Sequence, residues 1–140
     1  MKKLLTESHL RQFIHRSIVE SAIKNPSRSI SVANKRIQVE IADTEMSRNM
    51  GMMFRKNLNK NCGMLFIFED SAPRRFWMKN TYVPLSIAYI DSFGKIISIS
   101  DMSPLSESGV WSGGPAMYAL EMNKGWFSEN GVAPGDLVKI

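Results

Sequence analysis

From residue 29 onward, the chain is a series of short apolar runs of strand length that are separated by turn residues. Apolar and polar residues alternate most clearly at the start of this region, with apolar side chains at Ile30, Val32, Ile37, Val39 and Ile41. Such alternation places every second side chain on the same face of a sheet. A chain of 140 residues is long enough for one domain with a hydrophobic core. The pattern therefore predicts a mostly β fold, either a β-sandwich or a small barrel, with short helices.

Turn and capping signals divide these runs into elements. Residues 34–35 favour a hairpin turn between the first two strands, and residues 91–94 favour a second hairpin. The stretch 43–54 is typical of a short helix whose first turn is capped by Asp43 or Thr44.

The first 28 residues differ, because their apolar residues recur at helical spacing. A helix is expected over residues 4–24, and the Asn25–Pro26 pair ends it, since proline disfavours helical geometry in the residue before it. Its narrow apolar face consists of Leu10, Phe13, Ile14 and Ile18. We therefore divide the chain into a basic amphipathic helical arm with its linker, residues 1–28, and a compact β-domain, residues 29–140.

The basic charge of the chain is concentrated in its first 36 residues, which include this arm. Residues 1–36 carry eight basic and two acidic side chains, a net charge of +6, whereas the whole chain carries +5, so the remainder sums to −1. A nucleic-acid footprint requires a basic stripe on the domain itself, so nucleic-acid binding is disfavoured. A short isolated helix is marginal in water. We expect the arm to dock on protein, either its own domain, another subunit of a homo-oligomer or a separate partner; an anionic membrane surface is the alternative.

The sequence also bears on location. It contains no apolar run of the length that spans a bilayer. The N-terminal stretch lacks an uninterrupted apolar segment and a small-residue cleavage site, so no secretory signal is expected. An organelle presequence stays open because the stretch is amphipathic with Arg and Ser, although Glu7 and Glu20 count against it. We expect a cytoplasmic protein or a component of a larger soluble assembly.

The segment RRFWMK places a tryptophan between cations. If this segment forms a separate strand, one face of that strand carries Arg75, Trp77 and Lys79. Phe76 and Met78 share the other face and belong to the core. The charged face is either a cation–π ladder on the surface or the floor of a pocket in which Trp77 stacks on a planar or sugar-like ligand.

Two arginines flank the run NMGMMF. Arg48 and Arg55 are seven positions apart, about two helical turns, so both are expected on one side of a short helix. They either form an ion pair with Glu69 or Glu121, or join Lys79 as a clamp for an anion.

No familiar catalytic or metal-binding set is present. Cys62 is the single cysteine and both histidines fall in the N-terminal segment, so we assign Cys62 a structural or incidental role. Glu69 and Asp70 are adjacent and would face opposite ways in a strand, which makes a poor acid–base pair. The methionines suggest a soft-metal site, but without nearby Cys or His they are better explained as adaptable core side chains. We predict no catalytic residue, cofactor or metal.

Five segments occur in a characteristic order: RNMGMMFRKNL, GMLFIFE, FWMKNTYVPLSI, DSFGKI and PAMYALEMNKGWFSENGVAPGD. In this order they resemble the family catalogued as domain of unknown function 192, over about residues 29–140. The resemblance implies a compact, mostly antiparallel β-fold of the jelly-roll type, and it brings no agreed biochemical activity. It also implies an acidic residue after the PL pair, where this chain has Ser86.

Two main classes of function follow, and the absence of a catalytic set favours the first. The first is a non-enzymatic binding or structural module for a small anionic or sugar-like ligand, docked on a partner or assembly through the arm. Its candidate ligand-binding residues are Arg48, Arg55, Trp77, Lys79, Asn80 and Glu121. The alternative is a small enzyme acting on a carbohydrate or another anionic substrate, with Lys79, Asn80 and Glu121 as its polar residues.

The glycine-rich stretch 108–116 is expected to be a flexible loop. It leads into a strand rather than a helix, so it does not suit phosphate binding. Trp111 near its tip is a candidate partner contact or lid, because an exposed tryptophan on a loop is unusual for a purely structural residue.

Overall fold

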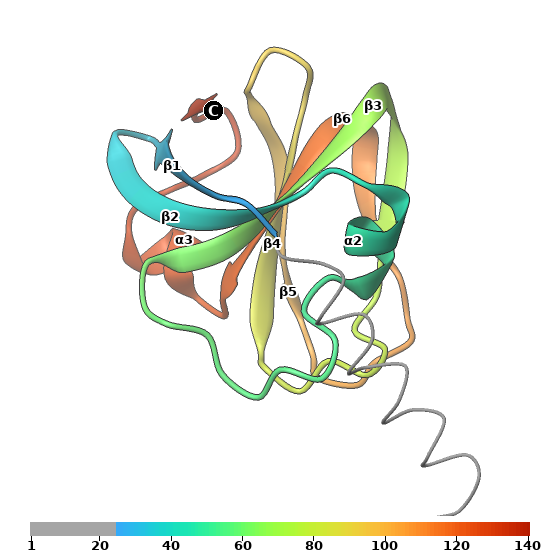
Figure 1. Cartoon of the computed structure of the whole chain (residues 1–140). Helices are drawn as coiled ribbons and strands as arrows, with labels where there is room; N and C mark the ends of the chain where they lie inside the picture. The colour runs from blue at the N-terminus through green and yellow to red at the C-terminus, as the bar shows by residue number, and fades with distance from the viewer. Residues whose placement is uncertain (1–24) are drawn as a thin grey trace, which may run out of the picture.

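The computed structural model describes residues 25–140, which form one seven-stranded sheet and two short helices (Figure 1). The strands are β1 (Ser27–Val32), β2 (Lys35–Ala42), β3 (Cys62–Phe76), β4 (Leu85–Ile90), β5 (Ile96–Met102), β6 (Val110–Asn123) and β7 (Val138–Lys139). The helices are α2 (Glu45–Met50) and α3 (Trp126–Glu129). The helix expected over residues 4–24, with its candidate partner contacts, lies outside the described residues. Within residues 25–140, no helix is long and apolar enough to cross a membrane.

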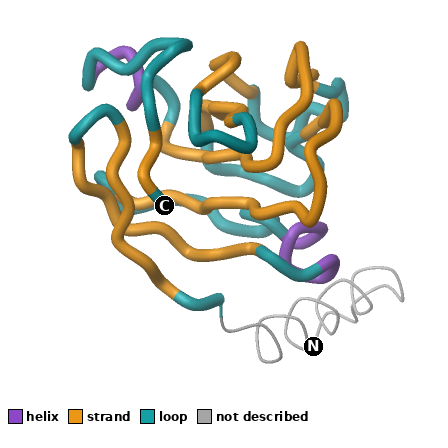
Figure 2. Tube along the Cα trace, turned by 90° about the horizontal axis from the view of Figure 1, so that it is seen from above, coloured by secondary structure: helices purple, strands orange, loops and turns teal. Residues whose placement is uncertain are grey.

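The sheet is mixed and curled. Its strand order is β5-β4-β6-β3-β2-β1-β7, and neighbouring strands are antiparallel except for β2 and β3. A bridge between Lys95 and Leu137 brings the two edges together at one end, so the sheet forms a half-barrel (Figure 2). The prediction of a mostly β fold is confirmed. The described strands lie in one curled sheet, not in the two sheets of a sandwich or jelly roll, so the small barrel was the nearer alternative.

Local signals in the sequence account for the connections. Ala33 and Asn34 form the turn between β1 and β2, both with the positive φ (46° and 69°) that tight hairpins favour. The turn lies one residue earlier than predicted, because Lys35 already pairs within the β1–β2 ladder. Thr44 caps α2, since its hydroxyl oxygen accepts a hydrogen bond from the Ser47 amide at 3.0 Å. The predicted short helix forms, but it covers Glu45–Met50 and not the whole of residues 43–54.

The two longest strands differ from the sequence prediction. β3 runs as one strand of 15 residues through Pro73 and ends at Phe76, so RRFWMK does not form a strand of its own. The pairing of β3 with β6 shifts register twice in the second half of β3, after Ile67 and after Pro73. These shifts bend both strands. The prediction of a flexible loop at 108–116 is wrong from Val110 onward. There the glycine-rich stretch pairs with β3 and forms part of β6.

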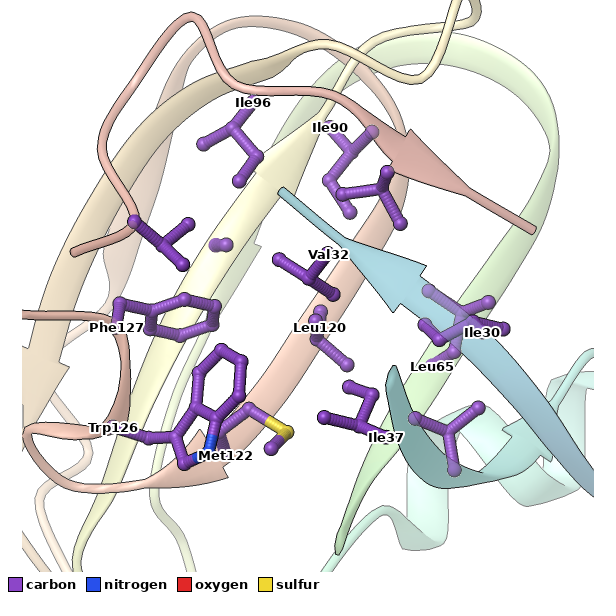
Figure 3. Packing of buried hydrophobic residues seen from close by; sticks show 14 of the residues in the cluster. Ile30, Val32, Ile37, Leu65, Ile90, Ile96, Leu120, Met122, Trp126 and Phe127 are labelled. Atoms are coloured by element: carbon purple, nitrogen blue, oxygen red, sulfur yellow. The ribbon is translucent and has the colours of Figure 1, made fainter. Parts of the chain in front are cut away.

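Each face of the sheet buries an apolar core. In the inner core, side chains from strands far apart in the sequence point toward one another inside the curl, with Trp126 and Phe127 of α3 closing one end (Figure 3). The second core lies on the outer face; its members include Met52, Met64, Phe66, Met78, Leu85, Ile87 and Tyr89. β4 is buried along its whole length because it contributes to both cores. Several methionines are thus core side chains, as the sequence indicates.

We predict that Phe76→Ala lowers the free energy of unfolding more than Trp77→Ala does. The Phe76 ring packs edge-on against Phe66, with 4.8 Å between ring centroids, and against Tyr89, with 5.7 Å. Removing a packed phenylalanine costs up to about 3–5 kcal/mol. Trp77 lies beyond the end of β3 and is 43% exposed, so its removal should cost less. Urea unfolding midpoints compare the two variants, and the reverse order would mean that these side chains face the opposite way.

Candidate functional site

A cleft of about 760 Å³ opens on the outer face of the sheet. Its walls are α2 with the residues that follow it and, opposite them, the end of β3 with the turn at 77–81. Figure 1 shows α2 beside the outer half of β3, where the Arg48 guanidinium donates a hydrogen bond to the Ile67 carbonyl at 2.9 Å. The apolar lining includes Met52, Phe54, Phe66, Phe68, Phe76 and Trp77. The polar lining includes Arg48, Arg75, Lys79, Asn80, Thr81 and Glu121.

Glu121 is the buried carboxyl group in this cleft. It lies on the interior strand β6, paired with Met64 of β3 and Ile87 of β4, and its side chain is 4% exposed. No group among residues 25–140 forms a hydrogen bond or ion pair with its carboxyl group. Burial raises the pKa of Glu121 to about 8, so the carboxyl group is largely protonated at pH 7.

Three cations surround the cleft, and each lies against an aromatic ring. The Lys79 ammonium is 5.2 Å from the centre of the Trp77 ring, and the Arg48 guanidinium is 5.2 Å from that of Phe68. Arg75 reaches Trp111, at 6.0 Å from the ring centre. Arg75, Trp77 and Lys79 thus take part in cation–π contacts and also line the cleft, while the stacking of Trp77 on a ligand stays a prediction.

Arg55 does not join this group. Its guanidinium forms a two-bonded ion pair with Glu40, one bond being 2.8 Å, beside a smaller hollow of about 360 Å³. This ion pair lowers the pKa of Glu40, although burial opposes the shift. The sequence suggested Glu69 or Glu121 as partners, on the assumption that Arg55 lies on a helix. α2 ends at Met50, so helical spacing does not extend to Arg55.

The turn after β3 closes one side of the cleft. Asn80 adopts a left-handed conformation with φ of 54°, and its carbonyl accepts a hydrogen bond from the Phe54 amide at 2.7 Å. The Thr81 hydroxyl donates to the Lys79 carbonyl at 3.0 Å. The turn chemistry predicted for Asn80 and Thr81 thus fixes the loop to the segment that follows α2.

Two residues named from the sequence lie elsewhere. Ser86 faces the opposite side of the sheet from Glu121, where its hydroxyl donates to Asp101 at 2.6 Å and accepts from the Gly125 amide at 3.0 Å. The acidic residue that the family resemblance implies at position 86 would therefore not enter the cleft. Trp111 is 64% exposed on β6 and is not part of the lining.

Sequence reasoning missed the aromatic wall of the cleft. Phe66 and Phe68 alternate on β3 with Leu65 and Ile67, so the period of two already places them on one face. That they meet Met52 from the segment after α2 follows only from the tertiary fold. In the described part of the chain, no group of three His, Cys, Asp or Glu residues is placed to hold a metal ion.

Fold and site together define a small β-rich protein, a half-barrel whose outer face carries a cleft with one buried carboxyl group. The chain belongs to the DUF192 family, described as "Uncharacterized ACR", whose model matches residues 28–140. The resemblance read from the five sequence segments is thereby confirmed.

Solved structures share this fold. One, from Sinorhizobium meliloti 1021 and provisionally assigned as a transcription regulator, is 34% identical, with a TM-score of 0.81 over 84% of this chain and 95% of that one. Another, a protein of unknown function from Novosphingobium aromaticivorans DSM 12444, is 29% identical, with a TM-score of 0.77 over 81% of this chain and 85% of that one. A search of curated proteins found no match.

We predict that Glu121→Gln raises the free energy of unfolding at pH 7, by on the order of 2 kcal/mol, and flattens its pH dependence. The pKa of Glu121 is raised from 4.5 to about 8 in the folded protein. Between these values the unfolded chain loses the proton and the folded chain keeps it, so stability falls as pH rises and levels off above about 8.

Urea unfolding at pH 5, 7 and 9 measures this dependence. Glu69→Gln is the matched control, because Glu69 is an exposed carboxylate on the neighbouring strand β3. An equal effect of both substitutions, or an undiminished slope in Glu121→Gln, would contradict the assignment.

Proposed function

We propose that this protein is a non-enzymatic binding module whose cleft receives a small ligand with an apolar or aromatic body and an anionic group. The observation that carries the proposal is the charge pattern of the cleft. Three cations surround an aromatic and methionine lining, and the one carboxyl group among the described lining residues is protonated at neutral pH. Such a cleft attracts anions, which guanidinium and ammonium groups bind through charge-assisted hydrogen bonds.

The size and lining of the cleft support the same conclusion. Small-molecule sites are mostly apolar hollows of about 300–1,000 Å³ with a few polar groups that set orientation. The Trp77 ring, half exposed at the mouth, offers a flat surface for a planar or sugar-like body. Arg55 is excluded from this proposal, because Glu40 already holds it outside the cleft.

An enzyme acting on a carbohydrate or another anionic substrate is the second candidate. A carboxyl group with a pKa of about 8 is suited to donate a proton near neutral pH, and Glu121 is such a group. Most glycosidases use two carboxyl groups that flank the scissile bond. The described lining of the cleft offers only Glu121, which favours binding over glycoside hydrolysis.

We expect Lys79→Ala to weaken the binding of an aromatic anion, such as phenyl phosphate or phenylacetate, by about tenfold, because a charge-assisted contact is lost. Lys124→Ala is the control: it removes an exposed lysine of the turn after β6, outside the cleft. Two-dimensional NMR titration of the full-length protein gives the affinity and shows which residues respond. Equal affinity of both variants, or responses away from the cleft, would reject the proposal.

The proposal includes docking through the arm, as the apolar spacing of residues 4–24 and the charge split suggest. Deleting residues 1–24 is the appropriate truncation, because Asn25 bonds to Glu40 and β1 begins at Ser27. We predict that the truncated β-domain still unfolds cooperatively but loses self-association or partner binding. Light scattering and circular dichroism measure both properties. A truncated protein with the same mass and the same partner binding as the full-length chain would refute the docking role.

A further inference from the structure

The two kinds of polar group in the cleft lie at different depths. Lys79 and Arg75 are exposed, and Trp77 beside them is 43% exposed. Glu121 is 4% exposed and lies on the sheet, next to the fully buried Met64 and Ile87. A ligand that fills the cleft therefore meets cations at the mouth and a carboxyl group at the inner end.

The charged and titratable groups around Glu121 leave its proton in place. The cations that line the cleft are Arg48 from α2, Arg75 from β3 and Lys79 from the turn, and none of them forms an ion pair with Glu121. On the β4 side Tyr89 interacts electrostatically with Glu121, and its hydroxyl donates to the Val110 carbonyl. Burial, and then the charge of Glu121, raise the pKa of Tyr89, so it too stays protonated.

A protonated carboxyl group has one O–H donor, and a buried donor without an acceptor is unfavourable. Among residues 25–140 no hydrogen bond to the Glu121 carboxyl group is found, and its oxygens are not fully enclosed, so they face the open cleft and a ligand that fills the cleft would take the place of solvent there. A ligand with a purely apolar inner end would leave this donor unsatisfied. A ligand with a cationic inner end would be repelled by the three cations that line the cleft.

We propose that the ligand carries an uncharged hydrogen-bond acceptor, such as a carbonyl oxygen or a ring nitrogen, at the end away from its anionic group, and that the Glu121 carboxyl group donates a hydrogen bond to it. This inference rests on the proposed function and names the ligand class more closely: an aromatic or apolar anion with an acceptor at its far end. Binding is then linked to protonation, because an ionised Glu121 repels the acceptor.

The test compares 4-acetylphenylacetate with 4-isopropylphenylacetate. Both probes carry the same anion and ring and have similar shapes, but only the acetyl group offers an acceptor. The isopropyl group is the more hydrophobic, so a preference for acetyl cannot come from apolar burial. NMR titration of the full-length protein at pH 6.5 and pH 9 gives four dissociation constants.

At pH 6.5 we expect the acetyl probe to bind about tenfold more tightly than the isopropyl probe, since only it satisfies the buried donor. At pH 9 this preference should disappear, because the folded-state pKa of about 8 leaves Glu121 mostly ionised. The Glu121→Gln variant should keep the preference at both pH values, because its amide donates a hydrogen bond and does not titrate.

The outcomes separate this inference from the proposed function. Equal affinities of the acetyl and isopropyl probes at pH 6.5, or an unchanged preference for the acetyl probe at pH 9, overturn the role of Glu121. Binding of either probe in the cleft still supports the proposed binding module. Tighter binding of 4-(aminomethyl)phenylacetate than of the acetyl probe also overturns it, since Glu121 would then act as an ionised partner. Failure of all three probes to perturb cleft residues rejects the proposed function itself.

Discussion

The antiparallel ladder between β3 and β6 is the contact on which both faces of the molecule depend. Alternate residues of β3 enter different cores: Leu65 packs inside the curl, and Phe66 packs on the outer face beside the cleft. The strands approach so closely at Gly63 that a Cβ atom there would overlap the Met122 sulfur and the neighbouring backbone carbonyl. Toward the other end, the register shifts bend the pair, and β3 ends at Phe76 in the lining of the cleft.

The buried carboxyl group of Glu121 works against stability in this arrangement. Its neighbours across the ladder are Met64 and Ile87, and an apolar side chain at position 121 would suit them better. The cations of the cleft do not offset the cost of burying this carboxyl group. The Arg48 guanidinium is bonded to the Ile67 carbonyl of β3, and the Lys79 ammonium lies over the Trp77 ring. Folding alone gives no reason for an ionisable group at this buried position in a cleft, which is why the proposed function assigns it a role.

Membership of the DUF192 family describes the fold without assigning it an activity. The solved relatives share the half-barrel, and fold alone does not determine function. The chemistry of the cleft therefore carries the functional argument. Ser86, where the family resemblance implies an acidic residue, forms hydrogen bonds with Asp101 and the Gly125 amide on the far side of the sheet, so its side chain does not enter the cleft.

The sequence by itself determined the elements whose causes are local. The hairpin at 91–94 forms because the Asp91 carboxylate accepts hydrogen bonds from the Phe93 and Lys95 amides, both at 2.9 Å, and α2 forms because Thr44 caps it. Met78 is buried and Trp77 is exposed, as the sequence predicted, although both lie beyond the end of β3 and not in a strand.

Features that depend on pairing between distant segments were decided by the tertiary structure alone. The stretch 110–116 reads as a loop until β3 lies beside it and takes up its backbone hydrogen bonds. The separation of Arg55 from Arg48 depends on where α2 ends and on the position of Glu40, 15 residues away in sequence. The raised pKa of Glu121 also depends on the tertiary structure. Only the packing of other segments over β6 shields that carboxyl group from water.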